Sequence, residues 1–115
     1  MKFAALIVII SAEHEDKIKK IAKEAGANGV MVVQAKGSGY EEKKSFFSLT
    51  FEGNHSLLFY ILEENIAKGV LKALKKELEN ETNGVAFTAP VSHIVGLNPN
   101  LINKFEETIK KEEVL

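Results

Sequence analysis

Residues 34–40, with the sequence Gln34-Ala35-Lys36-Gly37-Ser38-Gly39-Tyr40, connect two halves of the chain that share one design. They follow an apolar run, residues 29–34, that predicts a strand. Gly37 and Gly39 permit positive φ angles and a close approach of the backbone to a ligand. Successive N–H groups in such a turn form a concavity that binds anions. An ordinary hairpin loop is the alternative for the glycines alone, but the strand–helix–strand pattern on either side favours a functional loop.

Length and composition exclude several classes of function. The chain has 115 residues, enough for one domain, and its net charge of -1 shows no basic excess for nucleic acid or an anionic membrane. It contains no cysteine, which excludes disulfides, iron–sulfur clusters, zinc–thiolate sites and cysteine nucleophiles. The apolar run at residues 3–10 is too short to span a membrane and lacks the flanks of a signal peptide. We therefore expect a cytoplasmic protein that neither inserts into a membrane nor binds nucleic acid.

The first half of the chain predicts a strand, a helix and a second strand. Residues 3–10 form a strand that is apolar on both faces, and Ser11 is placed to cap the helix that follows. That helix has one apolar stripe and ends at Gly26. The stripe consists of Ile18, Ile21, Ala22 and Ala25. Residues 30–33 are the core of the second strand.

The second half repeats this pattern. Residues 45–51 predict either a short strand or one arm of an ordered loop, and residues 57–62 predict a strand that is again apolar on both faces. Glu64 or Asn65 is expected to cap the second helix, which stops at residues 82–84. Its expected buried side consists of Ile66, Val70, Ala73, Leu74 and Leu78. Residues 85–89 form the last main strand, and Pro90 places it at a sheet edge.

Beyond the last strand, Asn98 and Pro99 are expected to start a short amphipathic helix. Its apolar positions are Leu101, Ile102, Phe105 and Ile109. We therefore divide the chain into a main domain, residues 1–97, and a C-terminal helical extension of the same domain, residues 98–115.

Two β-α-β units in so short a chain predict an α+β fold of the ferredoxin-like βαββαβ type. Right-handed crossovers then place both helices on one face of an antiparallel sheet, and the short C-terminal helix is an addition to this core. The strands at residues 3–10 and 57–62 are nevertheless apolar on both faces. A bare apolar face of this size indicates a subunit interface, so we expect an oligomer.

The order of elements and several short motifs resemble the P-II signal-transduction proteins. Residues 36–39, Lys-Gly-Ser-Gly, resemble the Lys-Gly-x-Gly that opens the flexible T-loop of that family, and residues 84–91 are similar to its Gly-Lys-Ile-Phe-Val-x-Pro-Val strand. The apolar spacing of residues 66–74 resembles the family's second helix, and the resemblance covers residues 2 to about 96. It implies a homotrimer without catalytic activity that regulates a transporter or an enzyme, for example in nitrogen metabolism or transport. It also implies that ATP, ADP or AMP binds in clefts between subunits.

The chain departs from the family pattern at points that bear on ligand binding. The T-loop is several residues shorter than usual and has no tyrosine at an apex position for uridylylation. Val85 stands where a basic residue is expected to meet phosphate, and His55 stands where the family has a lysine. These departures predict a divergent P-II-like member that binds nucleotide with modest affinity.

The predicted ligand-binding residues come from three places in the chain. They are Lys36, Gly37, Ser38 and Gly39 in the first loop, His55 before the third main strand, and Thr82, Asn83 and Gly84 in the second loop. No catalytic residue and no metal ligand is assigned. Two alternatives stay open: a CutA-like ferredoxin-fold trimer that binds metal or serves as a structural module, and a small enzyme of the same fold. A cluster of histidines and carboxylates would favour the former, and a buried acid or base in the cleft would favour the latter.

Overall fold

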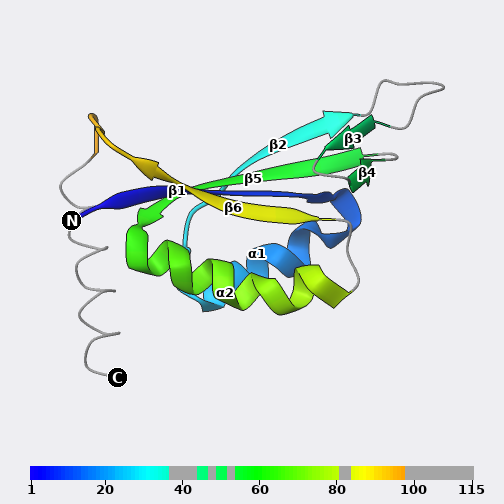
Figure 1. Ribbon diagram of the computed structural model, residues 1–115, viewed down its shortest axis with the longest axis horizontal. Helices are drawn as coiled ribbons and strands as arrows, with labels where there is room; N and C mark the ends of the chain where they lie inside the picture. Colours follow the sequence, from blue (N-terminus) through cyan, green and yellow to red (C-terminus); the bar gives the residue numbers. More distant parts are fainter. Residues whose placement is uncertain (37–43, 47–48, 52–53, 81–83, 98–115) are drawn as a thin grey trace.

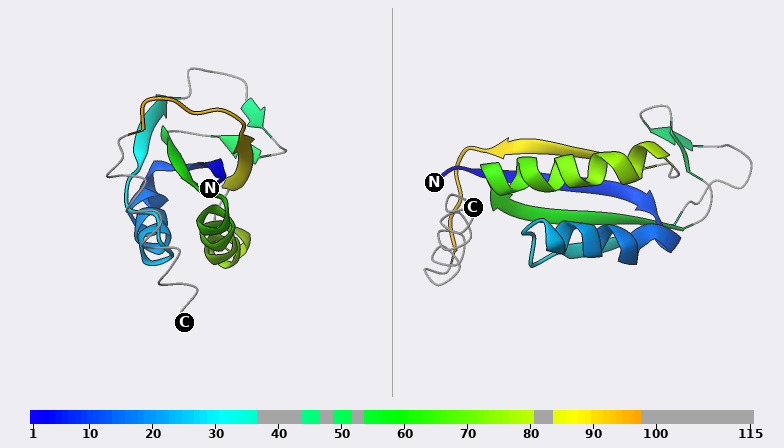
Figure 2. Two further views of the ribbon diagram at one scale, coloured as in Figure 1. Left: turned by 90° about the vertical axis from the view of Figure 1, so that its left-hand side faces the viewer. Right: turned by 90° about the horizontal axis from the view of Figure 1, so that it is seen from below.

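Four strands form one antiparallel sheet in the order β2-β5-β1-β6 (Figure 1). The computed structural model describes residues 1–36, 44–46, 49–51, 54–80 and 84–97. The elements are β1 (Phe3–Ser11), a 3₁₀ turn (Ala12–His14), α1 (Glu15–Glu24), β2 (Met31–Lys36), β3 (Lys44–Phe46), β4 (Leu49–Phe51), β5 (Asn54–Glu63), α2 (Glu64–Asn80) and β6 (Val85–Val91). Both helices lie on the same face of the sheet (Figure 2). The predicted ferredoxin-like α+β fold is therefore confirmed, while its C-terminal extension, residues 98–115, lies outside the described residues.

The core lies between the two helices and one face of the sheet. Alternate residues of β1 and β5 point toward the helices, because successive side chains of a strand point to opposite faces. Leu6, Val8 and Ile10 of β1 and Leu58 of β5 are completely buried there. The helices contribute Ile18, Ala22, Ile66, Ala67, Val70 and Leu74 to the same core. The predicted stripes are thus confirmed, except that Ala73 is exposed and Ala67 takes a buried position instead.

Helix ends differ from the prediction in two places. Ser11 is the last residue of β1, and its side chain makes no capping hydrogen bond; the 3₁₀ turn separates it from α1. Helix α2 is capped by Glu63, whose buried carboxylate accepts hydrogen bonds from the backbone N–H groups of Asn65, at 2.9 Å, and Ile66, at 3.0 Å. A glutamate one position before the helix reaches the orphan N–H groups that Glu64 and Asn65 were expected to satisfy. Gly26 ends α1 as predicted, with a φ of 115°.

Residues 44–51 contain a hairpin rather than one strand. Strands β3 and β4 pair with each other in an antiparallel two-stranded sheet, separate from the main one. Figure 1 places this hairpin at the end of the molecule where β2 ends and β5 begins. Of the two alternatives predicted for residues 45–51, a short strand or one arm of an ordered loop, the single strand is wrong, because Phe46 and Phe51 belong to two strands that pair with each other.

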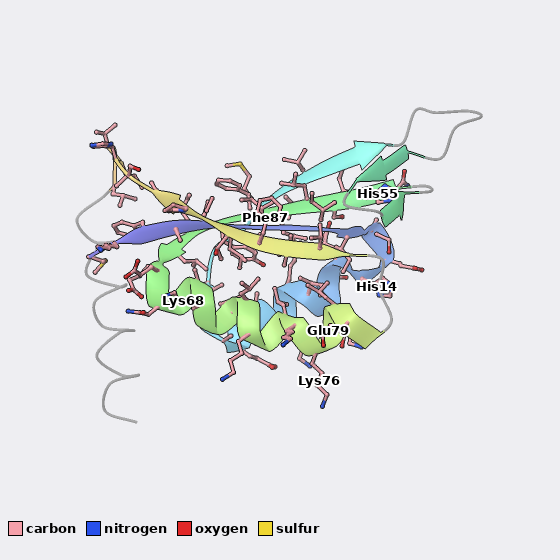
Figure 3. All side chains as sticks on the ribbon, in the orientation of Figure 1. His14, His55, Lys68, Lys76, Glu79 and Phe87 are labelled. Atoms are coloured by element: carbon pink, nitrogen blue, oxygen red, sulfur yellow. The ribbon has the colours of Figure 1, made fainter. Side chains whose placement is uncertain are left out.

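The sheet face opposite the helices is apolar along all four strands, and we call it the apolar sheet face. The register places Ile7 of β1 beside Phe59 of β5 and Phe87 of β6, and Phe87 lies on the side of the sheet away from the helices (Figure 3). The face consists of Phe3, Ala5, Ile7, Ile9, Met31, Val33, Leu57, Phe59, Ile61, Val85, Phe87, Ala89 and Val91. No described element covers it, and Met31 is 67% exposed. The prediction of strands that are apolar on both faces is confirmed.

One polar group in the core has an unusual environment. The Tyr60 side chain is 2% exposed, and its hydroxyl makes no hydrogen bond within the described part of the chain. Burial raises the pKa of this phenol. An unsatisfied buried donor costs about 1–3 kcal/mol, so removing the hydroxyl should relieve this cost without opening a large cavity.

We therefore expect Tyr60→Phe to unfold at the same temperature as the wild type or at a higher one, with a gain of up to about 1 kcal/mol in the free energy of unfolding. Chemical denaturation monitored by circular dichroism measures the difference. Tyr60→Leu is the control that removes the ring and should be destabilised by lost packing. A Tyr60→Phe variant that loses more than about 1 kcal/mol would show that the hydroxyl has a stabilising partner after all.

Candidate functional site

The described members of the predicted site lie at one end of the sheet. Lys36 ends β2, His55 lies at the start of β5, and Gly84 immediately precedes β6. The strand register aligns them: Ala35 pairs with His55, His55 pairs with Ser11, and Val85 pairs with Ile9 on the same half of β1. Residues that are far apart in sequence therefore share one end of the molecule, the end at which Figure 3 shows His55 and His14.

Within one chain, however, these residues lie on opposite edges of the sheet. Lys36 belongs to β2 and Gly84 leads into β6, and these are the two outer strands. Three strand spacings separate them, or about 14 Å at the usual 4.8 Å between neighbouring strands. Lys36 and Gly84 thus mark two separated groups of predicted ligand-binding residues, which we call half-sites, and the sequence alone did not show this separation. Gly37, Ser38, Gly39, Thr82 and Asn83 lie outside the described residues.

His55 occupies the position between the two half-sites. Its side chain is 7% exposed, and its place in β5 puts it at the end of the apolar sheet face, next to Ser11 of β1 and Ala35 of β2. A histidine side chain can donate and accept hydrogen bonds, and His55 lies at the end of the sheet where the other described members of the predicted site lie. The structure therefore leaves His55 as a candidate ligand-binding residue.

Gly84 has a packing reason to be glycine. A Cβ atom at this position would lie 3.0 Å from Cδ2 of Leu78 and 3.3 Å from Cγ1 and Cδ1 of Ile10. Any side chain there must displace core residues at the junction of α2 and β6. A bulky substitution at Gly84 would therefore disturb the fold as well as any ligand, and it is a poor probe of binding.

A polar cluster lies on the helix side of the same sheet end, and sequence analysis missed it. Oε1 of Glu15 accepts hydrogen bonds from Oγ of Ser56, at 2.6 Å, and from Nε2 of Gln34, at 2.7 Å, while Lys19 Nζ donates to Oε2 at 2.9 Å. The cluster joins the first turn of α1 to the last residues of β2 and the first residues of β5. It therefore fixes the two strand ends that flank residues 37–53. Only the Glu15–Lys19 spacing of four residues is visible in the sequence.

This network stabilises the charged form of Glu15. The hydrogen bond from Ser56 has the largest effect on the pKa of Glu15, and the hydrogen bonds from Lys19 and Gln34 act in the same direction. Together they lower this pKa from its ordinary value of 4.5 to about 2, although burial acts in the opposite direction. The cluster consequently stays ionised and intact throughout the physiological pH range.

We expect Glu15→Gln to lower the free energy of unfolding at neutral pH by about 1–2 kcal/mol, since hydrogen bonds to a charged group are worth roughly 1.5–3 kcal/mol and this one is partly exposed. Because the folded-state pKa is depressed, the wild-type stabilisation is present above the unfolded-state pKa of 4.5 and is lost as the pH falls through about 2. The difference between variant and wild type should therefore shrink as the pH is lowered. Urea denaturation at a series of pH values measures it. Glu24→Gln, at an exposed position of the same helix, is the control, and a difference that is independent of pH would contradict this assignment.

The described residues offer no support for a metal centre. Among residues 1–36, 44–46, 49–51, 54–80 and 84–97, no three His, Asp or Glu side chains are grouped so that they could hold a metal ion. In the same ranges, no helix is long and apolar enough to cross a membrane. The observation that would have favoured the CutA-like alternative is thus missing from the described part of the chain.

The fold and the placement of the predicted site residues describe a ferredoxin-like subunit that has an uncovered apolar sheet face and predicted ligand-binding residues, Lys36 and Gly84, at its two sheet edges. The sequence model of the nitrogen regulatory protein P-II family matches residues 3–100, and the chain belongs to this family. Comparison with curated protein sequences gives no match.

Solved structures share the fold at low sequence identity. A PII-like signalling protein of Thermus thermophilus superimposes with a TM-score of 0.62 at 21% identity, over 79% of this chain and 87% of that one. CPII, a nitrogen regulatory PII-like protein of Thiomonas intermedia, superimposes with a TM-score of 0.62 at 15% identity, over 84% of this chain and 98% of that one; its structure holds ADP, AMP and bicarbonate. The apo form of CPII gives a TM-score of 0.61 at 19% identity, over 79% and 90% of the two chains.

Proposed function

We propose that this protein is a homotrimeric P-II-like regulator that binds an adenine nucleotide in the clefts between its subunits. It has no catalytic role and acts in the cytoplasm by engaging a protein partner, a transporter or an enzyme. The observation that carries this proposal is the placement of the two half-sites, Lys36 and Gly84, on opposite edges of the same end of one sheet.

The apolar sheet face supports the trimer. The face has thirteen apolar positions on four strands, and the exposed side chains of Met31 and Val33, 67% and 49% exposed, illustrate how little the described elements cover it. Covering such a surface with further copies of the chain is the arrangement that the family resemblance implies, and the hydrophobic effect supplies the driving force at about 25 cal/mol per Å² of apolar area removed from water.

The separation of the half-sites supports a cleft between subunits. If neighbouring subunits bring the β2 edge of one sheet near the β6 edge of the next, Lys36 of one subunit would meet residues 82–84 of the other. A nucleotide can then contact both half-sites at once, although about 14 Å separates them within one chain. Backbone N–H groups of Gly37, Gly39 and Asn83 would bind phosphate oxygens, and Lys36 and His55 would supply charge or hydrogen bonds.

The ligands of a structural neighbour guide the choice of probe. CPII binds ADP, AMP and bicarbonate, so adenine nucleotides with and without bicarbonate are the first compounds to test. Val85 packs in the apolar sheet face beside Ile9 and cannot take the place of a phosphate-binding lysine. For this reason we expect affinities in the micromolar range rather than tighter binding.

Isothermal titration calorimetry with ATP, ADP and AMP, each with and without bicarbonate, tests the proposal. At least one nucleotide should bind with a dissociation constant between about 1 and 100 μM, equivalent to roughly 5.5–8 kcal/mol, with a stoichiometry of one per subunit. GDP, which differs from ADP only in its base, is the control that tests whether adenine is recognised. If no adenine nucleotide binds below millimolar concentration to a trimer of demonstrated integrity, the nucleotide reading is wrong and the trimer senses another ligand.

A further inference from the structure

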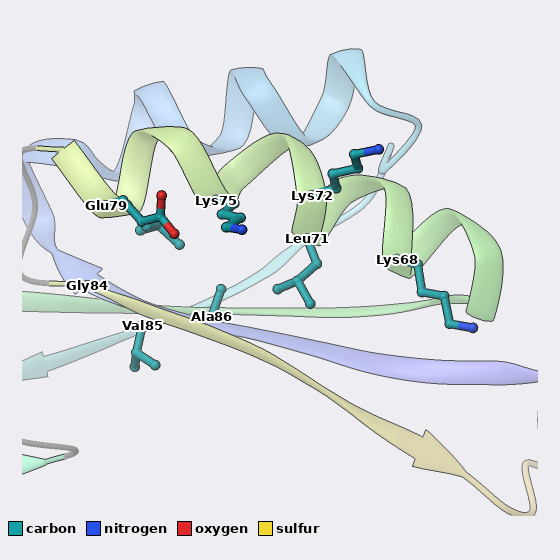
Figure 4. Close-up of a pocket in the computed structure, with 9 residues that line it drawn as sticks. Lys68, Leu71, Lys72, Lys75, Glu79, Gly84, Val85 and Ala86 are labelled. Carbon is teal, nitrogen blue, oxygen red and sulfur yellow. The ribbon is translucent and has the colours of Figure 1, made fainter.

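A groove of about 510 Å³ lies between α2 and the beginning of the edge strand β6 (Figure 4). Its apolar wall is formed by Leu71 and Leu78 of α2, which are half-buried, and by Ala86 of β6, whose side chain points toward α2. Sites for small molecules have volumes of about 300–1,000 Å³ and are lined mainly by apolar side chains. The groove therefore has the size and the lining of a small-molecule site.

Three lysines of α2, Lys68, Lys72 and Lys75, line the groove beside this apolar wall. All three are exposed, and none of them forms an ion pair with a described residue. Glu79 is the only acidic residue among those that line the groove. A surplus of positive charge raises the local concentration of anions. The groove thus favours a ligand that is partly apolar and partly anionic.

The groove is continuous with the half-site that Gly84 marks, because Gly84 itself lines the groove. From Gly84 the groove follows α2 toward Lys68, and the helix residues that line it, 68–79, span about 17 Å at 1.5 Å per residue. The proposed cleft holds nucleotide phosphates at residues 82–84. A substituent on the terminal phosphate of such a nucleotide would therefore start at the Gly84 end of the groove, whereas a plain mononucleotide would leave the groove empty.

We propose that the groove receives the arm of a nucleotide conjugate, an adenosine diphosphate whose terminal phosphate carries an extended and mainly apolar chain. This inference rests on the proposed function, since the half-site at Gly84 has to hold the phosphates. Lys75 is the lysine nearest in the chain to that half-site and would attract the diphosphate, while Leu71, Leu78 and Ala86 would contact the apolar chain. A coenzyme A thioester has this chemistry.

Calorimetry on the full-length protein with ADP, coenzyme A, octanoyl-coenzyme A and NAD tests the inference. Octanoyl-coenzyme A should bind at least about tenfold more tightly than coenzyme A, because the methylene groups of its acyl chain leave water for the apolar wall. NAD is the control for the chemistry of the arm, since it carries a polar arm on the same adenosine diphosphate. It should bind no more tightly than ADP.

Two variants locate the gain in the groove. Leu71→Glu places a carboxylate in the apolar wall and should remove the difference between octanoyl-coenzyme A and coenzyme A while leaving the affinity for ADP unchanged. Leu71→Met is the matched control, which keeps the wall apolar at similar volume and should keep the difference. Ala86→Leu fills the groove from the strand side and should have the same effect as Leu71→Glu. Circular dichroism checks the fold of each variant, and Ala86→Leu carries the test if Leu71→Glu does not fold.

Failure of this inference can be distinguished from failure of the proposed function. If ADP binds but octanoyl-coenzyme A binds no more tightly than coenzyme A, the inference is overturned and the nucleotide cleft stands. The same conclusion follows if NAD gains as much affinity as octanoyl-coenzyme A, or if the folded groove variants keep the gain. If neither ADP nor any of the conjugates binds, the proposed function is refuted and the inference with it.

Discussion

Replacing Ile7 with glutamate should convert the proposed trimer into folded monomers. Ile7 lies at the centre of the apolar sheet face, in register with Phe59 and Phe87. In an isolated subunit the introduced carboxylate is near the surface and can be hydrated. In the assembly it would be buried without a partner, which costs about 3–5 kcal/mol for each subunit, and a trimer contains three such sites.

Leu58→Glu is the matched control for this prediction. Leu58 is on the strand beside Ile7, but its side chain is completely buried between the sheet and the helices. A carboxylate at position 58 should therefore unfold the subunit itself, whereas one at position 7 should only separate subunits. Sedimentation velocity at micromolar concentration reports assembly, and circular dichroism reports folding. A wild-type chain that sediments as a monomer, or an Ile7→Glu chain that remains a trimer, would refute assembly through this face.

The second large effect concerns nucleotide binding. Lys36→Glu should reduce the affinity for the best adenine nucleotide by about 10- to 100-fold, corresponding to roughly 1.4–2.8 kcal/mol, because it replaces an attraction for phosphate with a repulsion. Gly39→Val should have a comparable effect by removing the close approach of the backbone. Both variants should remain trimeric. Lys23→Glu is the charge control, since Lys23 is exposed in the last turn of α1, away from the predicted site.

Mixed trimers can show that each site is shared between two subunits. Asn83→Glu damages the half-site at the β6 edge, and Lys36→Glu damages the half-site at the β2 edge. A homotrimer of either variant has no intact site, but a trimer that contains both kinds of subunit has junctions at which two undamaged halves meet. Calorimetry on co-expressed, tag-purified mixtures should recover up to about one third of the wild-type sites, from the three junctions of a closed ring. If the mixed trimers bind no nucleotide, the whole site lies within one chain, and the proposal of a cleft between subunits is contradicted.

Much of the fold follows from local patterns. The two-residue alternation of residues 3–10 and 57–62 and the helical stripes through Ile18 and Ile66 predict two β-α-β units, and two such units allow few arrangements other than the observed sheet. Element ends were less predictable. Ser11 does not cap α1, and Glu63 rather than Glu64 or Asn65 caps α2, because capping depends on how the chain enters the helix rather than on residue type alone.

The sequence suggested residues for the candidate site but not where they lie relative to one another. The glycines of residues 36–39 and the turn at residues 82–84 can be read directly from the sequence as loops suited to an anion. The placement of Lys36 and Gly84 on opposite edges of the sheet cannot be read in this way, since a strand pattern does not state which strands are neighbours. The packing of Gly84 against Leu78 and Ile10 was hidden for the same reason.

The amino-acid sequence by itself determined the fold class, the strands that are apolar on both faces and the resemblance to the P-II family, because hydrophobic periodicity and short motifs are local properties. Only the tertiary structure decided which apolar face is covered by helices, so that Leu58 is in the core and Ile7 is not. It also brought Glu15 to Gln34 and Ser56, which are 19 and 41 residues away in the chain. The physical reason is that side-chain direction is set by each strand, whereas the partners a side chain meets are set by strand order and register, and these depend on the whole chain folding together.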